Sequence, residues 1–312
     1  MAAANITESG TQTKTFERSD CSPFWVGELK QQSISFTAVN IFLSITAFLG
    51  NSLILVALRK ESSLHPPSKL LYRCLAITDL LVGLVTQPLY ATYWMAVVHE
   101  HWSICQYSFK ATGVTGFALC SVSLSTITAI SVDRLLAMLL GLRYKETVTL
   151  RRTYVILAII WVLSLVAGSL YHFNHSLLLW CGFIFAPSCL VISIASYTKI
   201  FRALSRHQAQ VQDHAQQQPS QTNALNMARN RKAVYSALWV LLALVFCYVP
   251  NVTVDILLTF RKNGSPNFII VKGMAVVIAF FNSTLNPFLY CWRNNEVSKA
   301  VKQTIRQAVF FA

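Results

Sequence analysis

Seven apolar segments dominate this sequence, and each is long enough to cross about 30 Å of membrane hydrocarbon as a helix. They are Gln31–Leu58, Cys74–Val98, Ala111–Val132 with a continuation to Leu140, Thr153–Phe173, Leu177–Thr198, Ala233–Val254 and Gly273–Trp292. Charged residues make up only 12% of the chain, whereas soluble domains carry about 25%. The sequence therefore predicts an all-α membrane protein, built as a seven-transmembrane helix bundle.

The two ends of the chain are more polar than the bundle. Residues 1–35 contain no apolar stretch typical of a secretory signal, so we expect an extracellular arm and an uncleaved first helix. The bundle is predicted over residues 36–294, and a cytoplasmic tail over residues 295–312. In that tail apolar residues recur every four positions beside basic ones: Val297, Val301, Ile305 and Val309 with Lys299, Lys302 and Arg306. This pattern predicts an amphipathic helix on the inner leaflet.

The distribution of basic residues predicts the orientation in the membrane. Of the 26 Lys and Arg residues, 19 fall in the segments on one side of the seven helices and seven on the other. Because cytoplasmic loops carry the excess of positive charge, the N-terminus is predicted outside and the C-terminus inside. The net charge of +14 follows from this topology, so no nucleic-acid partner is expected.

Five residues in the predicted extracellular segments carry modification signals. Asn5, Asn174 and Asn263 each begin an Asn-X-Ser/Thr sequence, which predicts N-glycosylation. Cys21 and Cys105 are the two cysteines outside the apolar helices, and the extracellular side is oxidising. We therefore expect a disulfide that ties the N-terminal arm to the top of the third helix.

The third helix is the expected centre of the bundle. Within Thr115–Leu139 the only charges are Asp133 and Arg134, side by side near its end. One helical face leading to Arg134 is small or polar for most of its length: Thr112, Gly116, Cys120, Ser123, Ile127 and Ile130. The opposite face is apolar: Phe117, Leu124, Val132 and Leu135. A helix of this kind must be surrounded by the others.

Asp79 is a carboxylate in the middle of the second helix, where an unpartnered charge is costly. Its candidate partners are Asn51, Ser123, Asn282, Ser283 and Asn286. Interhelical hydrogen bonds, worth about 0.6 kcal/mol each, explain the amides and hydroxyls but not the carboxylate. The sequence therefore favours an ion or proton site at Asp79.

Two prolines interrupt the helices that carry these polar groups. Asn282, Asn286 and Tyr290 are spaced by four and share one face of the seventh helix. Pro287 removes a backbone donor there, and Pro250 does the same in the sixth helix. Both helices are expected to be weakened where their polar groups concentrate.

Seven short motifs, one per helix, resemble the rhodopsin-like (class A) G-protein-coupled receptors from about Phe36 to the C-terminus. They are Gly50-Asn51, Leu75-Ala-Ile-Thr-Asp79, Asp133-Arg134-Leu135, Trp161, Tyr197, Cys247-Tyr-Val-Pro250 and Asn286-Pro-Phe-Leu-Tyr290. Within the family, Gly141-Leu-Arg-Tyr144 and Thr149-Leu-Arg-Arg152 resemble the melanocortin, adenosine and cannabinoid branch.

The resemblance implies a multi-pass plasma-membrane receptor, not an enzyme, that binds an extracellular ligand and activates heterotrimeric G proteins by outward movement of helix six. The activation switch would consist of Asp133, Arg134, Tyr197, Tyr248, Pro250, Asn286, Pro287 and Tyr290. No cofactor is implied beyond an allosteric sodium ion, which would lie at Asp79, Ser123, Asn282 and Asn286.

Four departures from the family pattern affect these expectations. Leu135 replaces the tyrosine of the Asp-Arg-Tyr motif, and Tyr248 replaces the tryptophan of the helix-six motif. Phe109 stands at the place of the family's helix-three cysteine, so the family's usual disulfide is not expected. Asn230 and Lys232 occupy the inner end of helix six, so no acidic residue there can hold Arg134, and appreciable basal activity is expected.

The ligand is constrained mainly by exclusion. Gly116 stands where amine receptors carry an aspartate, and Leu89, Phe109 and Gly113 stand where melanocortin receptors carry acidic residues. The predicted ligand pocket is Thr112, Gly116, Phe117, Cys120, Trp180, Tyr248, Asn251, Asp255 and Lys272. This mostly apolar set suits a small-molecule or lipid ligand and leaves a peptide open. Asp255 and Lys272 would form a gate, meet a charged ligand, or be a solvated pair.

Two other seven-helix functions, and catalysis, fit this sequence less well. A non-visual photoreceptor needs a lysine in helix seven, where Phe280 stands, and a transporter more often shows two related halves. An enzyme needs a nucleophile–base or metal constellation, and the seven histidines lack ligand spacing. The receptor function is therefore preferred.

Overall fold

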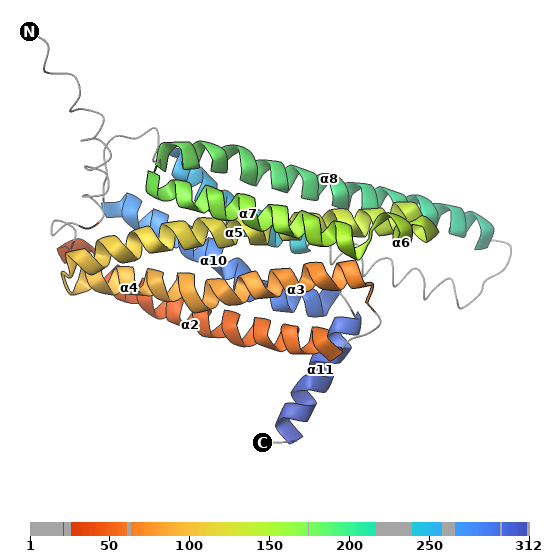
Figure 1. Ribbon diagram of the computed structural model, residues 1–312, viewed down its shortest axis with the longest axis horizontal. Coiled ribbons are helices and arrows are strands. Elements are labelled where there is room, and N and C mark those ends of the chain that lie inside the picture. Colours follow the sequence, from red (N-terminus) through yellow and green to blue (C-terminus); the bar gives the residue numbers. More distant parts are fainter. Residues whose placement is uncertain are drawn as a thin grey trace, which may run out of the picture.

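A computed structural model describes Cys21 and residues 26–60, 64–173, 175–215, 239–257, 266–293 and 295–310. Every regular element in these residues is helical, and the long helices run side by side along the long axis of the molecule (Figure 1). Seven of them are long and apolar enough to cross a membrane. The predicted all-α bundle of seven transmembrane helices is therefore confirmed.

The seven spans follow the predicted order, and six of them are longer than predicted, while the sixth is described over Trp239–Leu257. The helices are α2 (Val26–Lys60), α3 (Pro66–Leu81), η2 (Val82–Thr86), α4 (Gln87–Val98), α5 (Trp102–Leu140), η3 (Gly141–Arg143), α6 (Tyr144–Thr147), α7 (Leu150–Phe173), α8 (His175–Ala215), the helix Trp239–Leu257, α10 (Pro266–Arg293) and α11 (Asn295–Phe310). The first helix begins at Val26, inside the arm predicted for residues 1–35. Cys105, predicted outside the apolar helices, lies in the first turn of α5.

The sequence predicts one regular helix for the second transmembrane span, but this span consists of α3, η2 and α4 in succession. The element η2 is a turn of π-helix that directly precedes Gln87 and Pro88. Proline cannot donate the backbone hydrogen bond of a regular turn, and a π turn adds one residue to the helix locally. As a result, the sequence neighbours Thr86 and Gln87 are both fully buried.

The third span, α5, lies at the centre and packs against α3, α4, α7 and α8. Its predicted inner face is buried or half-buried along its length. Leu124 was expected on the outside but is only 2% exposed, because it belongs to the same buried apolar cluster as Leu157 of α7 and Leu190 of α8. The central helix is therefore enclosed on more sides than its polarity pattern predicts.

The outward faces of the bundle are apolar, as a membrane protein requires. Large apolar side chains such as Phe42 of α2, Leu163 of α7 and Val191 of α8 are exposed. Such surfaces are stable in a membrane, because the surrounding hydrocarbon already keeps these side chains out of contact with water.

The short helix α11 turns away from α10 and passes the end of α2 (Figure 1). Val297 and Val301 of its apolar stripe are buried, while Ile305 is exposed. Lys60, the last residue of α2, donates a 2.6 Å hydrogen bond to the Gln307 side chain. The predicted amphipathic helix is present, and its apolar stripe is partly used for packing against the bundle.

Candidate functional site

The carboxylate of Asp79 lies at the centre of the polar core, and its residue is 0% exposed. Its Oδ2 accepts a 2.7 Å hydrogen bond from Asn286 Nδ2, and its Oδ1 accepts hydrogen bonds from the hydroxyls of Ser283 at 2.9 Å and Ser123 at 3.2 Å. These donors come from α10 and α5. Three of the five partners expected from the sequence are therefore found, and a buried carboxylate with several donors is what its location requires.

Asn51 contacts the backbone of α10 instead of Asp79. Its amide donates to the Ser283 carbonyl at 3.0 Å and to the Ala47 carbonyl at 2.8 Å. Ser283 precedes Pro287 by four residues, so its carbonyl cannot receive the usual helical hydrogen bond. The Asn51 side chain replaces that bond. Nearby, a Cβ on Gly50 would lie 3.0 Å from the Pro287 ring, so α2 and α10 approach closely here.

Asn282, expected beside Asp79, donates instead to the Tyr248 hydroxyl at 3.3 Å. This bond joins α10 to the helix Trp239–Leu257. Ser283, the residue after Asn282 on α10, binds Asp79, so the bond lies next to the carboxylate site along that helix.

At the cytoplasmic end, Arg134 is held by the neighbouring Asp133. The two side chains form a salt bridge of 2.7 Å, and Arg134 also contacts the Ser68 hydroxyl of α3. Asp133 accepts two further hydrogen bonds, from Tyr144 at 2.6 Å and from Ser68 at 2.9 Å. Ser68 and Tyr144 were not predicted as site residues. The Gly-Leu-Arg-Tyr motif that ends at Tyr144 was the available signal, and nothing in the sequence indicated Ser68.

His65, the residue before α3, lies beside these side chains. The His65 ring centroid is 5.0 Å from that of Tyr144. Burial is the main cause that lowers the pKa of His65 below 6.5, with the charges of Lys145 and Arg134 adding to it and that of Asp133 opposing it. The imidazole is therefore neutral near pH 7.

At the outer end, Lys272 of α10 bridges to the helix Trp239–Leu257. Its ammonium lies 2.5 Å from Asp255 Oδ1 and 2.9 Å from Asn251 Oδ1. Asn251 also donates to Asp255 Oδ2 at 3.1 Å. Asp255 and Lys272 thus form a direct pair across the two helices, a contact that a gate and a solvated pair would both contain. Both side chains remain partly exposed.

Some of the other predicted pocket residues lie inside the bundle, and one lies on its surface. Thr112, Gly116 and Cys120 lie on the inner side of α5, and Phe117 faces Gly182 of α8. Trp180 is 56% exposed and meets Phe183 edge to face. Trp180 is thus separated from the interior set.

The structure describes some of the remaining predicted residues, and others lie outside the described part of the chain. Tyr197 is buried on α8, Pro287 is buried within α10, and Pro250 is partly buried. The Tyr290 side chain is not described. Residues outside the described ranges are Asn5, Asn174, Asn263, Asn230 and Lys232.

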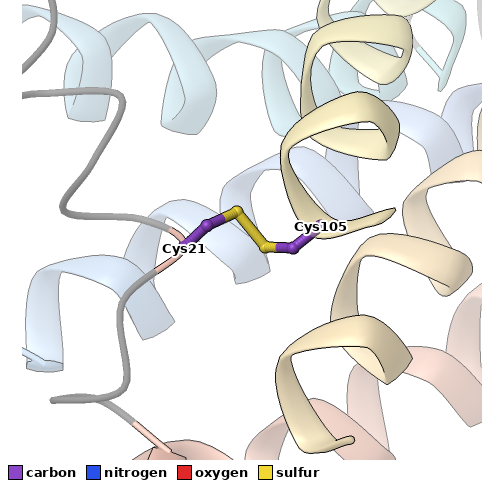
Figure 2. The surroundings of a disulfide bond; sticks show 2 residues. All are labelled: Cys21 and Cys105. Atoms are coloured by element: carbon purple, nitrogen blue, oxygen red, sulfur yellow. A yellow bond between two sulfur atoms is a disulfide. The ribbon is translucent and has the colours of Figure 1, made fainter. Parts of the chain in front are cut away.

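Cys21 and Cys105 form a disulfide with Cα atoms 6.0 Å apart, as predicted (Figure 2). Both cysteines are buried. The bond fixes one point of the N-terminal arm against the outer end of α5. The other cysteines in the described residues are free thiols.

The chain also matches a known family over most of its length. The family model for the 7 transmembrane receptor (rhodopsin family) matches residues 50–178 and 171–290. The matched region includes Asp79, the Asp133–Arg134 pair, Tyr248 and Asn286, which the structure places on inner faces of the bundle. Members of this family are receptors rather than enzymes, and they cross the membrane several times. This chain belongs to the rhodopsin family of seven-transmembrane receptors.

Proposed function

We propose that this protein is a plasma-membrane receptor that binds an extracellular ligand and activates heterotrimeric G proteins through outward movement of the helix Trp239–Leu257. The observation that carries the proposal is the hydrogen bond from Asn282 to Tyr248, because it connects that helix to α10 beside Ser283, which binds Asp79. A movement of the helix must break or rearrange this bond, so its position and the polar core are coupled.

The contacts of Arg134 support the second part of the proposal, the activation of a G protein. Arg134 is bound to Asp133 and Ser68, which corresponds to a resting arrangement. In the proposed active state the helix swings outward about Pro250, where the missing backbone donor weakens the helix. Arg134 then extends toward Tyr197 and Tyr290, and a crevice opens for the G protein. A ligand drives this change only by binding the open state more tightly.

The residues around Asp79 suit an allosteric sodium ion. The site offers a carboxylate and the Ser123 and Ser283 hydroxyls, and the buried Asn282 Oδ1 has no partner among the described residues. Oxygen donors are those that hard cations prefer. A bound sodium ion would supply a positive charge that compensates the buried carboxylate. If sodium favours the resting arrangement, linkage requires it to oppose agonist binding.

The ligand class follows from the outer residues. The site favours a small-molecule or lipid ligand over an extended peptide, and the Asp255–Lys272 pair would act as a gate between the two helices that it bridges. The predicted similarity to the melanocortin, adenosine and cannabinoid branch sets the first compounds to try.

The test is a ligand panel of nucleosides, lipids and amidated peptides on transfected cells, with cAMP and calcium readouts. We expect a response to one class that is lost in the Arg134→Ala variant while surface expression persists. A response to illumination, or ligand-independent flux of a substrate, would instead support the photoreceptor or transporter function.

A further inference from the structure

Two histidines lie at the outer turn between the second and third membrane spans. His99 directly follows α4, and His101 directly precedes α5. The sequence predicts no ligand spacing for this pair, because residues two positions apart on a regular helix do not face each other. In the structure their imidazole rings are nearly parallel, at 25°, and the ring centroids are 6.3 Å apart. The turn between the two spans therefore brings the two side chains together.

The hydrogen bonds of this turn are those of a Schellman cap, which explains its shape. The His101 N–H donates to the Ala96 carbonyl at 2.9 Å, and the Glu100 N–H donates to the Val97 carbonyl at 3.3 Å. Such a cap ends a helix with one residue in the left-handed region, where glycine is usual. Here that residue is Glu100, with φ 58°, and no other non-glycine residue in the described ranges has a positive φ. The reversal of the chain at Glu100 sets His99 and His101 side by side.

Glu100 adopts a conformation that is costly for a residue with a side chain. A left-handed residue other than glycine costs about 1–2 kcal/mol, and such strain persists only where the surrounding structure enforces it. The Trp102 N–H donates back to the Glu100 carbonyl at 3.1 Å, and the Cys105 N–H donates to the His101 carbonyl at 2.9 Å. Cys105 is bound to Cys21 through the disulfide. The backbone that carries the second imidazole is therefore fixed on the side of α5 as well.

The separation of the two rings suits a shared metal ion. Zinc binds histidine nitrogen at about 2.0–2.1 Å, so two imidazoles on one ion have ring centres about 5–6.5 Å apart. The observed 6.3 Å lies within this range. Both side chains are exposed, so an ion and its water molecules can reach them, and small rotations of the side chains can adjust the angle at the metal.

The site offers two protein ligands, and water would supply the others. In the described part of the chain, no three histidine, cysteine, aspartate or glutamate side chains are grouped so that they could hold an ion together. Imidazole is a ligand of nickel, copper and zinc, whereas calcium and magnesium prefer oxygen ligands. The carboxylate of Glu100, which lies between the two histidines in the sequence, adds a negative charge that attracts a cation. These features select a divalent transition-metal ion.

We propose that His99 and His101 form a metal site, the outer histidine site, for a divalent transition-metal ion of the copper and zinc type. Each imidazole contributes one nitrogen, and the ion joins the end of the second span to the start of the third. An ion that binds the folded turn stabilises it by mass action. The site shares no residue with the sodium site or with the predicted ligand pocket, and it goes beyond the proposed receptor function.

Zn²⁺ and Cu²⁺ alone test the proposal on the purified full-length protein in nanodiscs, prepared with an affinity tag that contains no histidine. The melting temperature is measured at constant pH while the ion is added, and EDTA then removes the ion. We expect both ions to raise the melting temperature, Cu²⁺ at a lower concentration than Zn²⁺, and we expect Ca²⁺ and Mg²⁺ to have no effect. Electron paramagnetic resonance of the bound Cu²⁺ should show coupling to two imidazole nitrogens.

Variants separate metal binding from folding. His99→Gln and His101→Gln should each weaken Zn²⁺ binding at least about tenfold, because the loss of an outer-shell partner alone already costs about 10–100-fold. Both side chains are exposed, so without metal these variants should melt like the wild type. Glu100→Gln keeps both imidazoles and should weaken binding less. His65→Gln, which removes a histidine at the cytoplasmic end, is the matched control and should bind Zn²⁺ like the wild type.

The proposal is overturned if Zn²⁺ raises the melting temperature of the His99→Gln/His101→Gln double variant as much as that of the wild type, since the ion would then bind elsewhere. It is also overturned if neither ion binds the wild type, or if the Cu²⁺ spectrum shows fewer than two imidazole nitrogens. Because no receptor ligand and no G protein are present, these results are independent of the proposed receptor function.

Discussion

Asn282 donates a 3.3 Å hydrogen bond to the hydroxyl of Tyr248, and this bond joins α10 to the helix Trp239–Leu257. The tryptophan usual at this place in the family has an indole N–H that only donates, so it could not accept this bond. Tyrosine in place of tryptophan therefore allows a direct hydrogen bond between the two helices.

Removal of that hydroxyl should loosen the polar core. Tyr248→Phe deletes the hydrogen bond from Asn282 with little change in shape, so we expect the free energy of unfolding to fall by about 1 kcal/mol. A loss of this size from the resting state corresponds to about a fivefold change in population, and basal nucleotide exchange should rise accordingly. Thermal unfolding and GTPγS binding measure the two effects. Tyr107→Phe, at a side chain 71% exposed, is the control, and equal behaviour of the two variants would contradict the prediction.

The contacts around Asp133 should restrain basal activity. Tyr144→Phe and Ser68→Ala each remove a hydrogen bond to a carboxylate, worth about 1.5–3 kcal/mol, and both should raise basal nucleotide exchange. Since the two residues share Asp133, the double variant should give less than the sum of the single effects. Ser188→Ala, at an exposed position on α8, should have no effect. Strictly additive effects would show that the three side chains do not act together.

The number, type and order of the helices could be predicted from the sequence because long apolar segments have few other stable structures in a bilayer. Two details could not. The π turn at Val82–Thr86 arises from the local backbone beside Pro88, whereas a regular helical period places Thr86 and Gln87 on different faces. Leu124 is buried because α7 and α8 cover it. Hydrophobicity alone cannot distinguish a lipid-facing leucine from a core leucine, since both environments are apolar.

The residues of the site could be predicted from the sequence better than the hydrogen bonds between them. Asp79 was expected to meet Ser123, Ser283 and Asn286, and it does, because few donors are available at its depth. Asn51 and Asn282 were expected at the same carboxylate but bind elsewhere. Helical spacing gives the face on which an amide lies but not which of several neighbours it chooses. The roles of these residues in activation, the sodium site and the glycosylation sites stay predictions.

The disulfide should contribute substantially to stability. Cys21 and Cys105 are separated by 84 positions, and a cross-link over a loop of that size typically contributes about 2–5 kcal/mol by restricting the unfolded chain. We expect a reducing agent to lower the melting temperature of the wild-type protein and to leave the Cys21→Ser/Cys105→Ser double variant unchanged. Cys181→Ser, which replaces an exposed free thiol, is the control. If reduction affects the double variant equally, the disulfide is not the cause.

The neutral His65 predicts a response to cytoplasmic acidification. The pKa of His65 in this conformation lies below 6.5, chiefly because the imidazole is buried. The stability of this conformation therefore does not change with pH above about 6.5, and it decreases as the pH falls below that value. Protons therefore favour states in which His65 is less buried or lies farther from the positive charges of Lys145 and Arg134. Basal exchange in nanodiscs should rise from pH 7.5 to about pH 6 in the wild type and stay flatter in His65→Gln. Superimposable profiles for the two proteins would refute the role of His65.

The central claim is that Arg134 transmits the state of the polar core to a G protein, and the most direct measurement is nucleotide exchange on a purified heterotrimer by the protein in nanodiscs. The account predicts that the wild type accelerates exchange and that Arg134→Ala, with an unchanged melting temperature, loses at least about nine-tenths of that acceleration, equivalent to about 1.4 kcal/mol. A folded Arg134→Ala variant that accelerates exchange as fast as the wild type would contradict it.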